Sequence, residues 1–591
     1  MKERNTRHDT WGGVNGLGEE LPLYNQVGDI KSDKFVGIFY LLWHPSIFGL
    51  SDPGKPRNVH ELLVNNPEAL HDADAKEWKP TGTFYWGEPL FGYYNLDVDI
   101  YVIRKHAQML SDIGIDTLVI DFTNFRENQL FYTKKTLTVL CDTFLQIRKE
   151  GKPTPQIICM TTWDGHFSGH AATVLFEDFY KPGLYDSLWF NWQGKPLIMA
   201  DKSAVTDKEV LEYFTFRKSH PHYYPPTEKD EWPWLSIIPP SKAFTDENAC
   251  EEVAIGAAQN WANGPSYTFM SAMDSSNNFI ARGRSYHNGK PLLLTNPVSS
   301  EYPSAQNYNL RESLDSAIEL DPNFLFVTSW NEWIAGRFTV DPFNTGDVLP
   351  PCGGFCDAFT AEFSRDIELT LTGGLGDNAY MILAAAIRRF KGLSPLEQVS
   401  IPHTIDLAGD FSQWQTVTPE YLDDVGDTYH RDCLDIFNQP IQNNSGRNDF
   451  ELLKVAFDAE YIYFYAQTVD SITPLCSSGW MQLLLRIGDG SNWEGYQYII
   501  GRKDTSEDFV TLERSLGGWN WEIVSDTIAY RVKENKMHMR IPLNTLGLNP
   551  NSINIQFKWA DNLQNSGDVF DFYTNGDVAP NGRFNYQFIV G

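Results

Sequence analysis

The chain has 591 residues, of which 42% are hydrophobic and 21% are charged. It is too long for one ordinary core and too apolar for a disordered chain, so we expect two or three domains. With 77 acidic and 47 basic side chains the formal net charge is -30, which disfavours nucleic acid and anionic membranes as partners. No stretch reaches the roughly 18 to 20 apolar residues of a membrane span, and the N-terminus lacks a signal-peptide core.

From residue 34 onward, short apolar segments alternate with helical patterns, as in a parallel sheet wrapped by helices. Residues 35–43 (FVGIFYLLW) form a near-continuous apolar run, typical of a strand buried on both faces. Apolar residues at helical spacing over 102–113 predict a helix that Gly114 ends before a second strand at 116–121. Further strands are expected at 156–160, 196–200, 235–238, 253–257 and 323–329.

This spacing predicts an α/β fold, a (β/α)8 TIM barrel over residues 34–393, with an N-terminal arm over 1–33. A doubly wound sheet is the alternative. It is disfavoured because the glycine-rich segment 12–18 precedes the first strand instead of following it. We expect a closing helix at 366–393 and a linker at 394–403.

Beyond the linker the pattern changes to short alternating segments such as LLKVAFD and YIYFYAQ, separated by Gly, Asn, Asp and Ser turns. This pattern predicts an all-β sandwich domain over 404–591. Its many tryptophans suit either a core or an aromatic platform for sugars. The cluster of Asp423, Asp424 and Asp427 fits a calcium site or a solvated loop, and we expect the loop.

Seven cysteines without CxxC pairs exclude a disulfide scaffold or a zinc array. Cys352 and Cys356 are spaced for a local bridge or are two unpaired small hydrophobic residues. His220 and His222 lack a third ligand at metal spacing, and neither a GxSxG elbow nor a catalytic-cysteine context is present. We therefore expect neither a metal nor a cofactor.

Catalytic side chains of a TIM barrel lie at the C-terminal ends of its strands. After the last predicted strand, in TSWNEW, Glu332 is flanked by two indoles, a setting that raises a carboxyl pKa and can hold a sugar. Its alternative is an ion pair with an arginine such as Arg337. Asp121 ends the second strand, where a buried acid must be paired or functional. Glu88, in the aromatic loop 86–94, is the third candidate, with a plain surface acid as its alternative.

The aromatic loop and the strand ends also supply side chains expected to bind substrate. Amides, acids and indoles bind sugar hydroxyls and the C–H face of a pyranose ring. The predicted residues are Trp43, His44, Tyr93, Tyr94, Asn124, Trp163, Asp164, Gln259, Trp330, Asn331 and Trp333.

The run FVTSWNEWIAG resembles the last-strand signature of glycoside hydrolase families 99 (endo-α-mannosidases) and 71 (α-1,3-glucanases) and of WbsX-like polysaccharide proteins. The segments GEPLFGYY and RKHAQMLSDIGIDTLVIDF resemble the early part of the same proteins. The tail, from IDLAGDFSQW to FKWADN, resembles family 9 carbohydrate-binding modules. The mannosidase pattern continues WNEWHE, whereas Ala335 stands here at the position of the second acid, so this loop cannot supply both carboxylates.

The resemblance implies a glycoside hydrolase that cleaves a polysaccharide or complex glycan through paired carboxylates. We assign these to Glu332 and Asp121, with Glu88 as the substitute. The alternatives are a non-catalytic glycan-binding protein and a WbsX-like enzyme of polysaccharide synthesis. The expected partner is a polysaccharide or oligosaccharide substrate, and the expected location is secreted, periplasmic or on the cell surface.

Overall fold

The computed structural model describes residues 5–43, 57–79, 83–124, 127–244, 249–262, 267–341, 349–475, 479–488 and 490–591. The chain forms two compact units. The first consists of Lys31–Lys391 and Cys433–Ile441, and the second of Met1–Ile30, Gly392–Asp432 and Gln442–Gly591. Among the helices of the described ranges, none has the length and apolar character needed to span a membrane.

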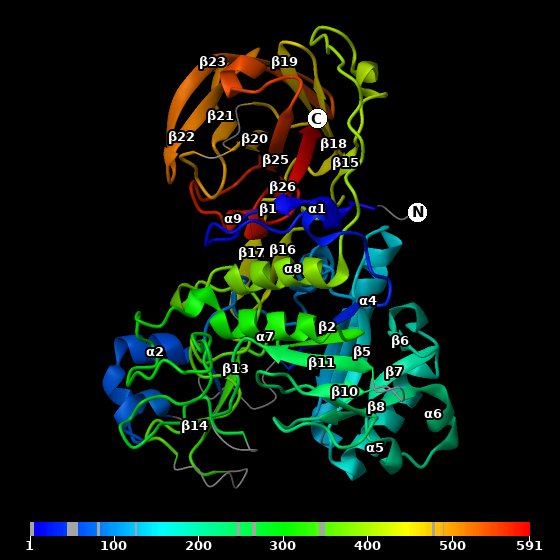
Figure 1. The fold of residues 1–591 in the computed structure, drawn as a ribbon, viewed down its shortest axis with the longest axis vertical. Coiled ribbons are helices and arrows are strands. Elements are labelled where there is room, and N and C mark those ends of the chain that lie inside the picture. Colours follow the sequence, from blue (N-terminus) through cyan, green and yellow to red (C-terminus); the bar gives the residue numbers. More distant parts are fainter. Residues whose placement is uncertain are drawn as a thin grey trace. The chain divides into compact units, whose positions relative to one another are not determined.

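The first unit is built on a mixed sheet of ten strands (Figure 1). Eight of them run parallel to their neighbours, in the order β11-β12-β2-β4-β5-β7-β8-β9. Their bounds are β2 (Phe35–Tyr40), β4 (Thr117–Phe122), β5 (Gln156–Thr161), β7 (Lys195–Met199), β8 (Thr215–His220), β9 (Glu231–Pro233), β11 (Cys250–Gly256) and β12 (Phe324–Thr328). Two short strands, β6 (Asn191–Trp192) and β10 (Lys242–Phe244), pair antiparallel. At one end of this strand order, β12 pairs with β2 and β11 pairs with β12. At the other end, β9 lies close to β10 and β11, so the sheet is nearly closed.

Helices connect the strands and flank this sheet (Figure 1). They are α3 (Ile100–Asp112), α4 (Glu127–Lys149), α5 (Gly165–Leu175), α6 (Lys208–Tyr213), α7 (Tyr308–Glu319) and α8 (Asn378–Lys391). Helix α3 begins where the Asp99 carboxylate accepts the backbone N–H of Val102. It ends before Gly114, whose φ of 84° favours glycine. This agrees with the helix predicted from the apolar spacing.

The prediction of a strand at 235–238 is wrong, because these residues form bends and irregular backbone, and the strand lies earlier, at β9. Strand β8 was not predicted. Its sequence TFRKSH has no continuous apolar run. Arg217 within it is nevertheless buried, and it pairs with Glu251 at 2.6 Å. A buried ion pair thus replaces the apolar signal on which the prediction relied.

The predicted helix over 366–393 begins only at Asn378. Gly373 and Gly374, with φ of 62° and 72°, interrupt the segment before it. Upstream of these glycines the backbone pairs with the loop after β12, where the N–H of Ile367 donates to Ser329 (3.0 Å) and that of Glu368 donates to Trp330 (3.0 Å). The segment therefore supports that loop instead of extending α8.

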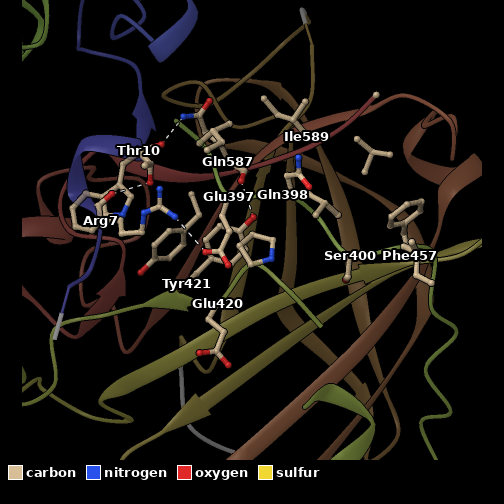
Figure 2. A pocket seen from close by; sticks show the side chains of 18 of the residues that line it. Arg7, Thr10, Glu397, Gln398, Ser400, Glu420, Tyr421, Phe457, Gln587 and Ile589 are labelled. Atoms are coloured by element: carbon tan, nitrogen blue, oxygen red, sulfur yellow. Dashed lines mark hydrogen bonds and ion pairs between the residues drawn. The ribbon is translucent and has the colours of Figure 1, made fainter. Parts of the chain in front are cut away.

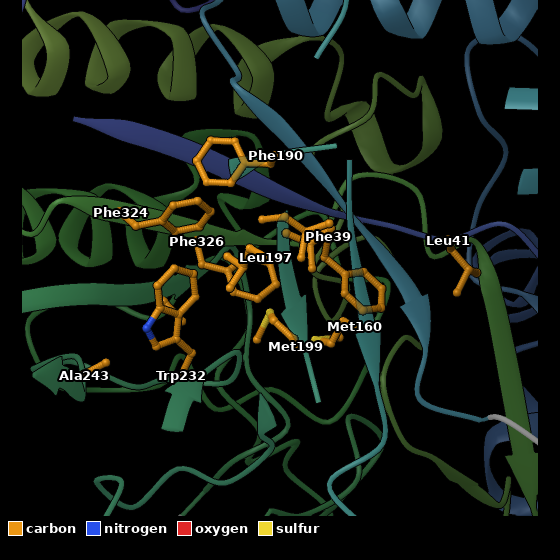
Figure 3. Close-up of a cluster of buried hydrophobic side chains, with 13 residues drawn as sticks. Phe39, Leu41, Met160, Phe190, Leu197, Met199, Trp232, Ala243, Phe324 and Phe326 are labelled. Atoms are coloured by element: carbon orange, nitrogen blue, oxygen red, sulfur yellow. The ribbon is translucent and has the colours of Figure 1, made fainter. Parts of the chain in front are cut away.

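The interior of the sheet is filled by side chains (Figure 3). Val119 of β4 and Phe39 and Leu41, within and just after β2, belong to this buried cluster. Side chains two residues apart on a strand share a face, so Asp121 lies on the face of Val119, one step closer to the C-terminal edge. Trp43 lies two residues after Leu41, on the same face, and packs against the cluster. Asp121 and Trp43 therefore both lie at the C-terminal edge of the sheet, next to the packed core.

The second unit is an all-β assembly of antiparallel strands in one twelve-stranded sheet. Its strands are β1 (Gly12–Gly13), β15 (Tyr421–Leu422), β18 (Phe450–Phe457), β19 (Tyr461–Thr468), β20 (Gln482–Arg486), β21 (Tyr498–Ser506), β22 (Phe509–Gly517), β23 (Asn520–Lys533), β24 (Lys536–Pro542), β25 (Ile553–Asp561), β26 (Asp577–Ala579) and β27 (Phe584–Val590). The predicted mixed α/β part followed by an antiparallel β part is confirmed.

The N-terminal residues differ from the separate arm that was predicted over 1–33. Gly12 and Gly13 pair antiparallel with Asn585 and Phe584 of β27, so the two ends of the chain share one sheet. Trp11 is buried and packs against Phe584 and Tyr586. No local pattern in the N-terminal sequence indicates this pairing, because its partner lies at the other end of the chain.

Candidate functional site

The loop that follows β12 is held by its own buried side chains. Trp330 is wholly buried against His106 and Tyr380, and Trp333 stacks on Trp86 with ring centroids 4.6 Å apart. Asn331 is also wholly buried and uses its amide to bind the backbone of Leu41. These three residues were expected to bind substrate, but in this arrangement they fix the loop and leave no surface for a sugar ring.

Glu332 is the member of this loop that reaches the surface, with 17% of its side chain exposed. Its carboxylate accepts a hydrogen bond from Arg365 Nη2 at 3.2 Å. Its backbone N–H donates to Asp366 Oδ1 at 2.6 Å. The other oxygen of Asp366 accepts the indole N–H of Trp86 (2.7 Å), so Asp366 holds both the loop and the ring stacked on it.

Arg365 is buried and connects Glu332 to a second carboxylate. The same Nη2 donates to Asp357 Oδ1 at 2.6 Å, and the Asp357 side chain is 38% exposed. Asn260 contacts Asp357 through its amide (3.5 Å), and its oxygen accepts the hydroxyl of the buried Tyr223. Glu332 and Asp357 are therefore separated by no more than two hydrogen-bond lengths.

Neither Asp357 nor Arg365 was singled out from the sequence. Asp357 directly follows the glycine-rich aromatic run CGGFC, the same type of signal that pointed to Glu88 in its loop. Arg365 lies next to the segment predicted to be a helix, which hid its role. Arg337, the arginine expected to be the alternative partner of Glu332, instead donates to the Cys352 carbonyl at 2.6 Å.

The carboxyl groups of this site have raised pKa values. Burial raises the pKa of Glu332 well above its usual range; Arg365 opposes the shift, and Asp357, Asp366 and Asp121 add to it. Burial raises the pKa of Asp121 to about 6, against hydrogen bonds from Thr123, while Asp357 raises it further. One guanidinium cannot balance Glu332 and the three acids around it, so the protonated form of Glu332 is favoured.

Asp121 lies near this group at the end of β4. It is 2% exposed, accepts the backbone N–H of Thr123 at 2.8 Å, and a hydrogen bond from Trp43 lowers its pKa. The structure thus brings Asp121 and Trp43 together at the ends of two neighbouring strands. His44, also predicted to bind substrate, falls outside the described residues.

The remaining predicted residues divide between buried and exposed positions. Tyr94 donates to Glu368 (2.7 Å), Gln259 accepts from Asn309 (2.9 Å), and Tyr93 is buried, so these three are structural here. Three others are exposed at strand ends of the same sheet, namely Asn124, Trp163 and Asp164.

Glu88 is exposed and lies apart from the interactions described for the Arg365 group. Its backbone N–H donates to the Thr372 hydroxyl at 3.0 Å, and its carbonyl oxygen accepts from Thr370. Nothing in these contacts joins its carboxylate to Glu332.

Ala335, the position at which the resembled motif carries an acid, lies in β13 (Ile334–Phe338). It is wholly buried and pairs with Phe84 of β3 (Thr83–Tyr85), beside the ring of Trp78. A carboxylate at this position would face aromatic rings. The second acid of the site must therefore come from another segment.

One set of side chains in the second unit could hold a metal ion. Carboxylate oxygens of Asp423, Asp427 and Asp577 lie within 4.8 Å of one another. Asp423 is wholly buried, and burial raises the pKa values of Asp423 and Asp577 well above their usual range, with the neighbouring acids adding to both. The solvated loop expected here is thus wrong, because Asp577 of β26 completes a buried acidic group. Cys352 and Cys356 are both free and buried.

A cavity of about 490 Å³ also lies in the second unit (Figure 2). Among its lining residues, Arg7 donates to Glu397 at 3.3 Å and to the Pro395 carbonyl at 2.7 Å. Tyr421 donates to the backbone carbonyl of Gln587 at 2.7 Å. These polar groups are therefore already engaged in hydrogen bonds within the protein. The carboxyl groups bound to Arg365 belong to the first unit, not to the unit that holds this cavity.

No family model matches the chain, and no curated protein matches it. Solved structures do show a distant likeness. Two structures of the GH99 endo-α-mannosidase from Bacteroides thetaiotaomicron, one with BIS-TRIS-propane, share 13% and 15% identity, each over 60% of this chain and 96% of that chain, with TM-scores of 0.33 and 0.34. A glycoside hydrolase-like protein shares 11% identity over 63% of this chain and 97% of its own, with a TM-score of 0.33. Likeness at this level does not assign an activity to the chain.

Proposed function

We propose that the protein is a glycoside hydrolase with a (β/α)8 barrel and a β-sandwich, acting outside the cytoplasm on a polysaccharide or oligosaccharide. The observation that carries this proposal is the binding of Glu332 and Asp357 to Arg365, with Asp121 close enough to act on Glu332, at the edge where the parallel strands end. Barrel enzymes place their catalytic groups at that edge. Hydrolysis of a glycosidic bond needs two carboxyl groups, one protonated and one ionised.

Glu332 is the proton donor in this proposal, because its surroundings favour the protonated form. For the second carboxylate we choose Asp357 over the Asp121 assigned from sequence. Asp357 is 38% exposed and can reach a substrate, whereas Asp121 is 2% exposed. Two carboxyls bridged by one nitrogen are also closer to the roughly 5 to 5.5 Å of retaining glycosidases than to the wider spacing of inverting ones.

The reaction then proceeds in two displacements. Asp357 attacks the anomeric carbon while Glu332 gives its proton to the leaving oxygen, which forms a glycosyl ester and releases the first sugar product. A water molecule then attacks the same carbon and gives its proton to Glu332. The ester bond breaks, and both carboxyls return to their starting states. Asp121 contributes by raising the pKa of Glu332.

Glu332→Gln tests the assignment directly. Turnover of polysaccharide should fall by about a thousandfold or more with an unchanged melting temperature. Activity should recover in part on aryl glycosides with activated leaving groups, because these need little protonation. A fully active variant removes Glu332 from the mechanism. Glycan binding without turnover in the native protein favours the binding-protein alternative, and stabilisation by nucleotide sugars favours polysaccharide synthesis.

A further inference from the structure

Trp163 has an unusual environment for a tryptophan of this chain. With 45% of its surface exposed, it is the only one of the 18 tryptophans, all of which lie in the described ranges, whose side chain is exposed to solvent. It stands two residues beyond β5, the neighbour of β4, in which Asp121 pairs with Met160. An exposed indole keeps a large apolar face in water, which is unfavourable unless something covers it.

Two further rings continue from Trp163 along the ends of the strands. The centroid of His222, just beyond β8, is 6.3 Å from that of Trp163, and the two rings meet edge to face with planes 68° apart. Tyr224, which is 40% exposed, stacks on His222 with centroids 4.7 Å apart and planes 12° from parallel. Trp163, His222 and Tyr224 therefore form a row of rings, here called the aromatic platform.

Buried side chains of β8 and β9 hold the rings of the platform in place. His220 is buried, and its Nε2 donates to the backbone carbonyl of Tyr224 at 2.8 Å. Its Nδ1 lies 3.5 Å from the Glu231 carboxylate, which fixes the ring. Burial, together with the neighbouring His220, lowers the pKa of His222 and so favours its uncharged ring, although Glu231 acts in the opposite direction. The platform thus offers the exposed, uncharged rings of Trp163 and Tyr224, with His222 packed between them.

The platform is joined to the carboxyl site through one backbone step. Tyr224 is exposed, while the preceding Tyr223 is buried and donates its hydroxyl to Asn260. Asn260 in turn contacts Asp357. The Tyr223–Tyr224 peptide therefore has one side chain in the carboxyl site and the next in the platform, which places the two at adjacent positions on the same edge.

We propose that the aromatic platform is a sugar-binding subsite for a pyranose ring next to the residue whose bond is cleaved. Flat, neutral rings match the C–H face of a pyranose, and the exposed Asp164 beside Trp163 can accept hydroxyl hydrogen bonds. This inference rests on the proposed function and extends it, because a subsite of this kind makes the enzyme prefer chains over short glycosides.

The test uses the full chain carrying Glu332→Gln, so that the probe is not consumed. Native gels that contain yeast α-mannan, dextran, laminarin or xylan measure binding by the retardation of the protein. Trp163→Ala and Tyr224→Ala should each weaken binding about tenfold, and Trp163→Phe should restore most of it, as expected for ring stacking. Phe244→Ala is the matched control, since Phe244 is an exposed ring of the same unit that pairs with Cys250, at the opposite end of β11.

Equal retardation of Trp163→Ala and Phe244→Ala would overturn the platform, as would the absence of retardation in every gel. With Glu332 intact, hydrolysis of aryl glycosides reports on the proposed function separately. Phe244→Ala should leave both this hydrolysis and KM for long chains at the native level, whereas Trp163→Ala should raise KM for long chains about tenfold. If the native protein hydrolyses aryl glycosides but Trp163→Ala does not weaken polysaccharide binding, the proposed function stands and the sugar-binding subsite is refuted.

Discussion

The backbone N–H of Glu332 donates to Asp366 Oδ1 at 2.6 Å, so a buried acid on a distant segment orients the residue proposed as proton donor. Burial raises the pKa of Asp366 to about 6, against the hydrogen bonds from Glu332 and Trp86. An acid held in this way is a positioning residue.

Asp366→Asn should lower kcat by about ten- to a hundredfold with little change in KM. The amide can accept only through its one oxygen, so one of the two N–H donors, from Glu332 or Trp86, faces a donor and is left unpaired. The same change should reduce the free energy of unfolding by about 1 to 3 kcal/mol. Steady-state kinetics and urea unfolding measure both effects. An unchanged kcat in a destabilised variant would show that Asp366 supports only the fold.

Asp121→Asn should move the alkaline limb of the pH profile of kcat/KM to lower pH. The Asp121 charge raises the pKa of Glu332, so its removal lets the proton donor ionise at lower pH. Thr123→Ala is the comparison variant at the same strand end: it keeps the carboxylate and the backbone N–H that binds it, and removes only the side-chain hydrogen bond from Thr123, which lowers the pKa of Asp121. A thousandfold loss at every pH would instead make Asp121 the second catalytic carboxylate and contradict the choice of Asp357.

Ala335→Glu, which restores the acid of the resembled motif, should destabilise the protein and add no activity. Ala335 is wholly buried opposite Phe84, so the new carboxylate would lose its water and have to fit among packed rings, at a cost of about 3 kcal/mol or more. Ala335→Gln has nearly the same volume without the charge and should lose less. Urea unfolding of the two variants compares them, and a Glu variant as stable as the native chain would refute the burial argument.

Phe437→Ala should destabilise the first unit, although Phe437 lies far along the chain from its barrel strands. Phe437 is 4% exposed, and its ring packs at 6.0 Å from Tyr85 and 5.6 Å from Tyr93. Removal of a buried phenyl ring costs about 3 to 5 kcal/mol. Hydrogen exchange of β3 compared with β20 locates the loss, with the 85% exposed Ile401→Ala as a neutral control. Equal protection of β3 in both variants would contradict the prediction.

The sequence by itself determined much of the framework. Strands β2, β4, β5, β7, β11 and β12 lie where continuous apolar runs predicted them, because strands buried on both faces need such runs. The change of pattern near residue 393 coincides with the change of unit at Gly392. Glu332 and Asp121 were proposed as catalytic residues by the same local rule, since each follows or ends an apolar strand.

The tertiary structure decided which side chains meet. The link from Glu332 through Arg365 to Asp357, the burial of Trp330 and Trp333, and the contact of Trp163 with His222 join residues from different loops. Local periodicity reports only which face of a strand or helix is apolar. The path of a loop follows from the packing of the whole unit, so only the folded chain shows which acid shares a guanidinium and which indole stays in water.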